Sequence, residues 1–175
     1  MFRNPIDFHN CGARDCYVNC LNYLVTNYIE MLEEKNDIKL INKTGVMGDK
    51  ISAIELQFEY YEMLDVQGSR QMMLQLIDSF VQSINSYDRL RPYLECPFTQ
   101  DNVSIRVNFI SKRKFSYPQP GEVKYMSYMD GVITYMAENP RCLGDLEKIR
   151  AEPISFARML AYPIPPPGCS DRFPQ

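Results

Sequence analysis

No apolar stretch of this sequence is long enough to cross a membrane, because the longest ones are interrupted by Asn, Thr or Glu. The first residues, MFRNPIDFHNCGARD, also lack the apolar centre of a signal peptide. Two alternatives therefore stay open at this point. The protein is cytosolic, or it is exported and a leader has been removed.

An excess of charge of either sign is also missing. The 175 residues carry a formal net charge of −3, which provides no general attraction for nucleic acid or for an anionic membrane. Apolar residues make up 45% of the chain and charged residues 23%, and these ordinary proportions argue against overall disorder. We therefore expect a single domain over residues 1–162, followed by a proline-rich tail at residues 163–175.

Recognisable catalytic motifs are missing as well. The sequence has no nucleophile elbow, P-loop or dinucleotide fingerprint. A Cys–His nucleophile would need His9, the only histidine, yet this residue lies near the amino terminus with no evident orienting partner. The carboxylate pairs Glu33–Glu34 and Asp145/Glu147 have the pattern of solvated faces. We expect no catalytic residue and no cofactor.

Cysteines are present, but they do not form a dense framework. In an exported chain they are expected to form disulfides, whereas in the cytosol buried thiols are expected. Of these alternatives we favour export with at least one disulfide. The six residues are Cys11, Cys16, Cys20, Cys96, Cys142 and Cys169.

One cluster has the residue types of a metal site. Cys16 and Cys20 are spaced i, i+4 and would share a helix face, and His9 and Cys11 can complete a tetrahedral zinc site. The spacing matches no standard zinc finger or knuckle. The competing interpretations are disulfides to the three later cysteines or reduced thiols. We expect no metal, and keep zinc as the weaker alternative.

The strongest element in the sequence is a helix over residues 65–87. Asp65 is suited to cap its first turn, and Pro92 lies beyond its end. The polar residues, Arg70 among them, fall on the opposite side from an apolar stripe. That stripe consists of Met73, Leu76, Ile77, Phe80, Val81 and Ile84.

Alternating patterns predict four strands around this helix. Residues 54–60 and 103–109 alternate apolar and polar side chains, and residues 122–129 and 132–137 flank Asp130-Gly131, a strong hairpin signal. The last three strands follow one another and predict an antiparallel meander. The helix would then be the crossover that brings the first strand into the same sheet.

Further helices are predicted at both ends. An amphipathic helix begins at Asp15, followed by a short strand at residues 38–41 and a loop at residues 42–49. Pro153 fits a first helical position, and Phe156, Met159 and Leu160 give the helix after it an apolar side.

These elements define an α+β fold. We expect a four-stranded, mostly antiparallel sheet with the central helix on one face and additional amino- and carboxy-terminal helices. Residues 1–37 form the cysteine-containing segment and first helix, and residues 50–137 form the strand–helix–three-strand core.

Several short motifs between residues 51 and 162 recur in known proteins. They are Ile54-x-Leu-x-Phe58, Ile84-Asn85, Arg91-Pro92-Tyr93-Leu94, Pro97-Phe98-Thr99, the strand from Val103, Asp130-Gly131 and Glu152-Pro153. On these motifs, residues 51–162 resemble an uncharacterised family of small α+β proteins from intracellular Gram-negative bacteria. The resemblance implies export in many members, and it implies no known activity. The cysteine-containing segment lies outside it.

A basic loop beside aromatic residues is one candidate binding site. Lys112, Arg113 and Lys114 precede Phe115 and Tyr117, a combination that can bind phosphate groups or single-stranded nucleic acid. The competing interpretation is a soluble loop whose charges prevent edge pairing. Because three charges on an acidic chain favour the second interpretation, nucleic acid is not the expected partner.

The last hairpin is the second candidate. We expect Tyr125, Met129, Ile133 and Tyr135 on one face, and Lys124, Met126, Tyr128, Thr134 and Met136 on the other. Both faces would be partly apolar, so either the amino-terminal helix covers the second face or a partner does.

Two functional hypotheses result. The first is a non-catalytic, exported module that binds another protein through its sheet face or hairpin. The second is a small-ligand or catalytic pocket between the sheet and the central helix. The inward positions of the strands are apolar, which favours the first.

Overall fold

One mixed sheet carries the fold of the computed structural model, which describes residues 13–34, 36–48, 50–94, 98–112, 121–142 and 144–162. Within these residues six strands pair in the order β1-β2-β4-β6-β7-β8. Their bounds are β1 (Ile38–Met47), β2 (Ile51–Tyr60), β4 (Val103–Phe109), β6 (Tyr125–Met129), β7 (Val132–Glu138) and β8 (Leu146–Pro153).

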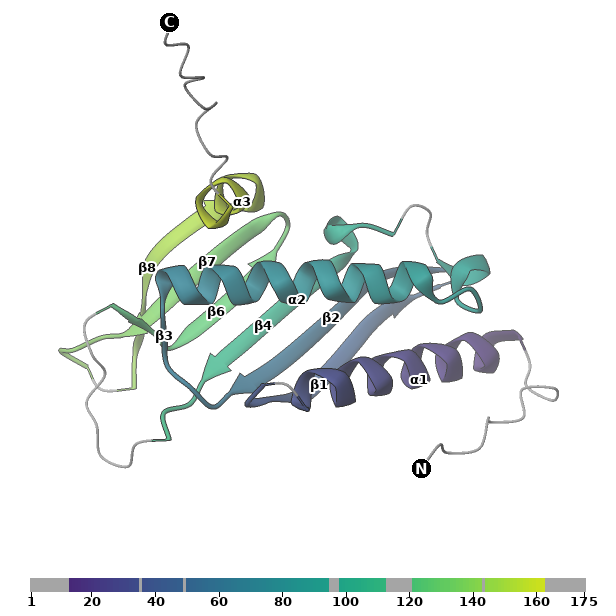
Figure 1. Cartoon of the computed structure of the whole chain (residues 1–175), viewed down its shortest axis with the longest axis horizontal. Helices are drawn as coiled ribbons and strands as arrows, with labels where there is room; N and C mark the ends of the chain where they lie inside the picture. The colour runs from purple at the N-terminus through teal and green to yellow at the C-terminus, as the bar shows by residue number, and fades with distance from the viewer. Residues whose placement is uncertain are drawn as a thin grey trace, which may run out of the picture.

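Three helices accompany the sheet in the described residues, as Figure 1 shows. They are α1 (Ala13–Glu33), α2 (Val66–Ser86) and α3 (Ile154–Ala161). Short 3-10 helices lie at Arg91–Tyr93 and Gln100–Asn102, and β3 (Leu64–Asp65) pairs with β5 (Glu122–Val123) beside the main sheet. None of the helices in the described ranges is both long enough and apolar enough to cross a membrane.

The sheet is larger than predicted, although the α+β class is confirmed. The four predicted sheet strands correspond to β2, β4, β6 and β7. The short strand predicted at residues 38–41 is the start of the longer β1, and β1 and β8 form the two edges of the sheet. Among the described strands of the main sheet, β2 and β4 form the one parallel pair, connected through α2 as expected for the crossover. The other pairs are antiparallel.

The two edge strands have weak local signals. Residues 42–47 were predicted as a loop because Asn, Lys, Thr and Gly disfavour strands, yet they pair with β2 along its length. The residues of β8 are nearly all exposed, and their sequence does not alternate between apolar and polar side chains. Pairing with a formed neighbour stabilises both strands where intrinsic propensity does not.

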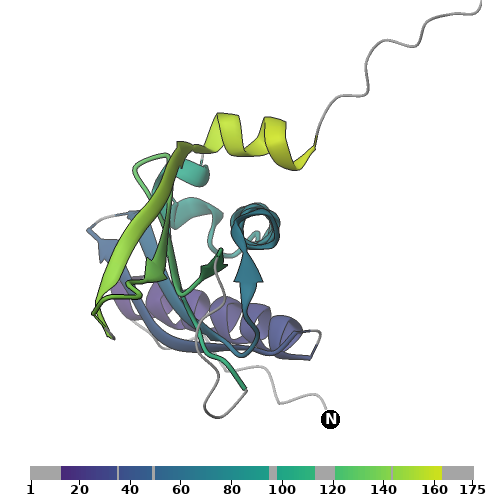
Figure 2. The same cartoon turned by 90° about the vertical axis from the view of Figure 1, so that its left-hand side faces the viewer.

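α2 lies on one face of the sheet, as predicted, and is viewed end-on in Figure 2. The Asp65 side chain caps it by accepting a hydrogen bond of 2.7 Å from the backbone N–H of Gly68. Its apolar stripe meets the inward side chains of β2 and β4 in a closed interface. Fully buried residues there are Met73, Ile77, Phe80, Ile84, Leu56, Phe58, Ile105, Val107 and Phe109.

α1 packs against β1 and α2 on the same side of the sheet (Figure 1). The helix is formed as predicted, but it does not cover the second face of the hairpin, which was the place considered for it from the sequence. The buried Tyr28 ring lies 5.1 Å from that of Phe80, and its hydroxyl donates to the carbonyl of Leu76 at 3.1 Å. Burial raises the pKa of Tyr28 to about 12, although a hydrogen bond with Ser79 opposes the shift. The two helices and the sheet thus share one core.

The hairpin between β6 and β7 forms as predicted. Asp130 and Gly131 both have positive φ, at 50° and 77°, which is the conformation that this dipeptide tolerates. The predicted faces are wrong, however. Because Met126 pairs with Tyr135 and Tyr128 with Ile133, these four residues share the buried face.

α3 also differs from the expectation. Pro153 caps the helix as the last residue of β8 instead of starting it. The buried side of α3 consists of Ile154, Ala157 and Ala161, and the larger apolar residues point outward. Small alanines allow the short helix to lie close to β7, β8 and α2.

Candidate interaction site

The predicted metal cluster falls mostly outside the described residues. His9 and Cys11 lie outside them, as does the side chain of Cys16, while Cys20 is buried on α1. Among the side chains that the structure describes, no group of three or more His, Cys, Asp or Glu residues is arranged to hold a metal ion. Zinc binding stays a prediction.

The disulfide prediction also involves cysteines that lie mostly outside the described residues. The described part of the chain contains no disulfide bond, and its cysteine side chains are the buried Cys20 and the exposed Cys142. Cys96 and Cys169 lie outside the described ranges, together with the amino-terminal cysteines. Export with at least one disulfide therefore stays a prediction.

The basic loop is described only at its first residue. Lys112 is exposed and forms an ion pair with Asp37, next to the start of β1. Arg113 and Lys114 lie outside the described residues. The one cation that can be placed is therefore already engaged by a carboxylate.

The three tyrosines of the hairpin do not form one surface. Tyr128 and Tyr135 are fully buried on the inner face, and Tyr125 is half-buried on the outer face. Two of the three are thus inaccessible to a partner. The outer face of β6 and β7 presents Met129 and Val132 instead, and both are exposed.

A buried charged cluster joins α2 to β7 and β8, and the sequence patterns did not reveal it. Arg70 donates from Nε to Glu152 Oε1 at 2.6 Å and from a terminal nitrogen to Oε2 at 3.2 Å. The Tyr135 hydroxyl donates to Oε1 at 2.7 Å, and Arg150 donates to Oε2 at 2.7 Å. Arg70 is 4% exposed and Glu152 is 2% exposed.

These contacts determine the protonation of the cluster. Burial alone would raise the pKa of Glu152, but the hydrogen bonds from Arg70 and Tyr135 and the nearby guanidinium charges lower it overall. Burial raises the pKa of Tyr135, and the Glu152 carboxylate raises it further. The carboxylate is therefore held ionised and the phenol neutral. This arrangement stabilises the contact between α2 and the carboxy-terminal strands.

Arg70 had been placed on the polar side of α2, and the structure places it in the core. It lies near the start of the helix, where it reaches β8 and where Gln67 accepts a further hydrogen bond from it. Its partner is 82 residues away in the sequence, so no local pattern could identify the pair.

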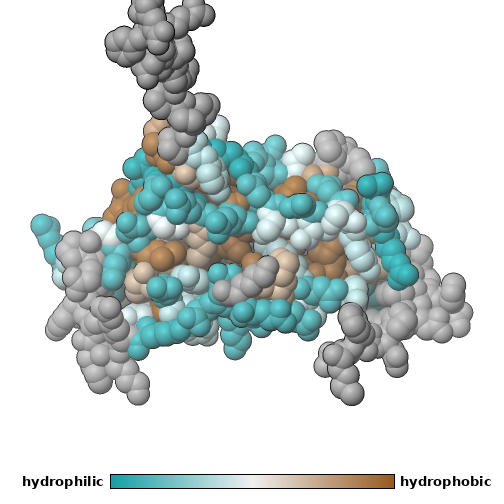
Figure 3. All heavy atoms as spheres, in the orientation of Figure 1, coloured by the Kyte–Doolittle hydropathy of each residue, from teal (hydrophilic) through white to brown (hydrophobic). Residues whose placement is uncertain are grey.

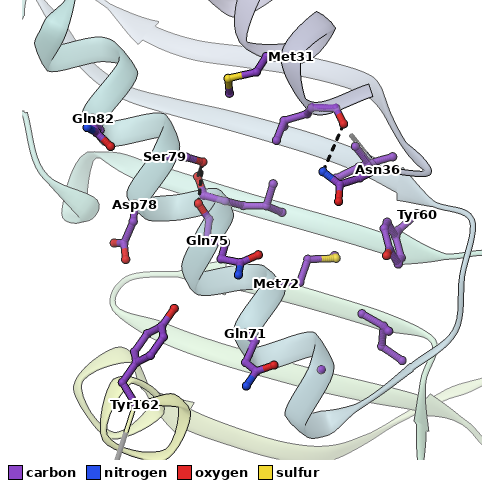
Figure 4. Close-up of a pocket in the computed structure, with 15 residues that line it drawn as sticks. Met31, Asn36, Tyr60, Gln71, Met72, Gln75, Asp78, Ser79, Gln82 and Tyr162 are labelled. Atoms are coloured by element: carbon purple, nitrogen blue, oxygen red, sulfur yellow. Dashed lines mark hydrogen bonds between the residues drawn. The ribbon is translucent and has the colours of Figure 1, made fainter. Parts of the chain in front are cut away.

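A groove of about 660 Å³ lies over the outer side of α2, with α1 and α3 as its walls. Figure 4 shows Met31 and Asn36 on one side of α2, Tyr162 on the other, and Gln71 and Gln75 between them. The remaining lining residues are Leu32, Ile38, Tyr60, Leu64, Gly68, Met72, Leu76, Asp78, Ser79 and Gln82.

The groove has a firmly held wall at α3. Arg158 donates two hydrogen bonds to the Asp78 carboxylate, at 2.8 and 2.5 Å, and a third to the Gln100 side chain at 3.1 Å. This bidentate pair joins α3 to α2 and occupies Asp78, the one carboxylate among the described residues that line the groove. The remaining lining is neutral, with amides above apolar side chains.

Exposed apolar residues lie on two elements that are joined to each other, the hairpin turn and α3. We call this set the corner surface: Met129 and Val132 beside the hairpin turn, and Phe156, Met159 and Leu160 on α3. The backbone N–H of Ile154 donates to the carbonyl of Gly131 at 2.9 Å, which joins the two elements. Figure 3 shows hydrophobic residues over α3.

Comparisons with protein-family models, with curated proteins and with solved structures found no match to this chain. By its fold the chain belongs to the two-layer α+β class, with a six-stranded mixed sheet across the described residues. The family resemblance of residues 51–162 stays a prediction.

Proposed function

We propose that this chain is a non-catalytic, exported module that binds another protein through the corner surface. The observation that carries the proposal is the outward stripe of α3. Phe156, Met159 and Leu160 are spaced i, i+3 and i+4, and their exposed fractions are 44%, 68% and 38%. Large apolar side chains at this spacing are the pattern by which a helix docks in an apolar groove.

The rest of α3 supports this interpretation. Its inner side is held by Ile154, Ala157 and Ala161, and its one charged side chain, Arg158, is directed toward Asp78. The outward stripe therefore carries no charge and is not needed for the contact with α2. A partner that offers a neutral, apolar groove matches it.

Strand addition at the neighbouring edge is a less suitable mode of binding. β8 is an edge strand with a register irregularity between its pairs at Tyr135 and Met136, and it exposes Glu147, Lys148 and Arg150. Bulges and charges of this kind prevent edge-to-edge pairing. This favours recognition through side chains of α3, and it argues against a second copy paired along β8.

The alternative, a ligand pocket between the sheet and α2, has less support. The side chains that meet there are apolar and fully buried. The polar cluster at the end of this interface consists of Arg70, Glu152 and Tyr135, whose groups satisfy one another.

The test uses a photo-crosslinking amino acid at position 159 of the full chain, produced in its own cells. We expect a discrete crosslink to one other protein. The matched control is position 46, since Val46 is 64% exposed on β1 at the other edge of the sheet. The partner is then purified, and its affinity for the chain is measured with and without Phe156→Glu.

Phe156→Glu should weaken binding at least tenfold with little change in the melting temperature, because Phe156 lies on the exposed side of α3, opposite Ile154, Ala157 and Ala161. The proposal is rejected if the same product forms at position 46. Crosslinks only between copies of this chain, or only to lipid, would also reject it, as would a Phe156→Glu variant that binds as tightly as the wild type.

A further inference from the structure

We infer that the groove over α2 is the docking site for this chain's own proline-rich segment, residues 163–175. The inference concerns a surface distinct from the corner surface and does not depend on the proposed function. It rests on the chemistry of the groove, on where the segment begins, and on the length of that segment.

The groove presents a row of exposed amide side chains. The side chains of Gln71, Gln75 and Gln82 are exposed along one side of α2, and none makes a hydrogen bond to the part of the chain that the structure describes. Each amide offers two N–H donors and one acceptor. A row of such groups on a helix suits a ligand with regularly spaced backbone carbonyls.

A proline-rich segment is a ligand of this kind. The run from Pro163 to Pro167, PIPPP, predicts a polyproline II conformation, in which the backbone carbonyls are free to accept hydrogen bonds. Proline-rich segments pack well in grooves lined by aromatic side chains. The groove supplies Tyr60, Tyr162, Met31 and Met72 beside the amides.

The segment starts at the groove itself. Tyr162, the residue before Pro163, lines the groove from the α3 wall, and the Arg158–Asp78 pair holds that wall in place (Figure 4). A ligand attached at the rim has an effective concentration in the millimolar range for a short connection. Weak contacts are therefore sufficient for occupancy within one chain.

The lengths agree as well. From Gly68 to Gln82 the α2 side of the groove extends about 21 Å at about 1.5 Å per residue. A polyproline II segment covers this distance with about seven residues, and residues 163–175 provide more than that. The charged residues of the segment, Asp171 and Arg172, follow these first seven residues in the sequence.

The test measures binding of a labelled peptide to the full chain by fluorescence anisotropy. The peptide has the sequence of residues 163–175 with Ser in place of Cys169. The tail variant is the full chain with Pro163, Pro165, Pro166 and Pro167 replaced by Ser. If the native tail occupies the groove, the peptide should bind the tail variant at least tenfold more tightly than the wild type.

Groove substitutions then locate the site. Gln71→Ala with Gln75→Ala, made in the tail variant, should weaken peptide binding at least tenfold. Gln57→Ala is the matched control, since Gln57 lies on β2 and faces away from α2, and it should leave binding unchanged. Thermal unfolding checks that each variant is folded.

Several outcomes overturn the inference. These are equal peptide affinity in the wild type and the tail variant, no binding to either, or no effect of the two groove substitutions. A dimer of the wild type that is lost in the tail variant would place the segment on a second copy, and would reject docking within one chain.

Discussion

Glu152 is one of two charged residues buried in the described part of the chain, the other being Arg70. Its carboxylate is buried and accepts hydrogen bonds from Arg70, Tyr135 and Arg150. A buried ion pair of this kind contributes little compared with an apolar pair of the same volume, because both charges lose their hydration. Removing one partner is costly, since the other charge is left buried.

Glu152→Gln should therefore lower the free energy of unfolding by about 3 kcal/mol, because Arg70 loses its counter-charge inside the core. Urea unfolding followed by circular dichroism measures this change. The control is Glu55→Gln. Glu55 Oε1 lies 3.1 Å from Arg106 Nε, and that nitrogen donates no hydrogen bond within the described residues. A loss of about 1 kcal/mol or less is expected there. Equal losses in the two variants would contradict the role given to Glu152.

The same carboxylate should make stability depend on pH. Its pKa in the folded protein is lowered, so its contribution is complete above the pKa of the unfolded chain, 4.5, and is lost as the pH falls through the lower folded pKa. The difference in unfolding free energy between wild type and Glu152→Gln should thus be largest near pH 7 and smallest near pH 3. Urea titrations at the two pH values measure it. A difference that stays constant would show that Glu152 acts without its charge.

Local sequence patterns predicted correctly the elements whose own residues contain the signals for their start and end. The central helix was predicted at residues 65–87 and observed at Val66–Ser86, with Asp65 as its cap. The β4 strand was predicted at residues 103–109 and observed there, since its alternation is complete. β8 and most of β1 were missed because their pairing partners stabilise them, and a pattern within one segment cannot reveal a distant neighbour.

The cap of α2 gives a test at the level of the element. Asp65→Ala should lower the free energy of unfolding by about 1 kcal/mol, because the backbone N–H of Gly68 loses its acceptor. Thermal and urea unfolding measure the change. Asp88→Ala is the matched control, an exposed aspartate that lies 3.7 Å from Arg91 just beyond the helix, and it should have almost no effect.

For the whole molecule, sequence reasoning reached the α+β class and the crossover but placed the candidate site poorly. It selected Tyr128 and Tyr135 by residue type, and both are in the core. It treated the apolar side of α3 as ordinary amphipathic packing, whereas Ala157 and Ala161 make the inner side. Which side of a short helix faces inward depends on how closely its neighbours approach, and a single sequence does not contain that distance.

The layout of the sheet predicts how its stability is distributed. β4 pairs on both sides and has alternate side chains fully enclosed, whereas β8 is an edge strand with most of its residues exposed. Hydrogen exchange of the native protein should therefore be slowest in β4 and α2 and much faster in β8. Mass spectrometry of labelled peptic fragments measures this order. Slower exchange in residues 146–150 than in residues 103–109 would contradict the arrangement of the sheet.

The parallel pairing of β2 with β4 has a consequence for synthesis of the chain. Ile54 of β2 pairs with Val103, about 50 residues later, and α2 must be made between them. At about 5–20 residues per second, this gap corresponds to roughly 2–10 s on the ribosome. During that time β2 can pair with β1 on one side, but its other edge has no partner, although β2 becomes an interior strand of the finished protein. The newborn chain therefore passes through a period in which a molecular chaperone has a natural target at β2.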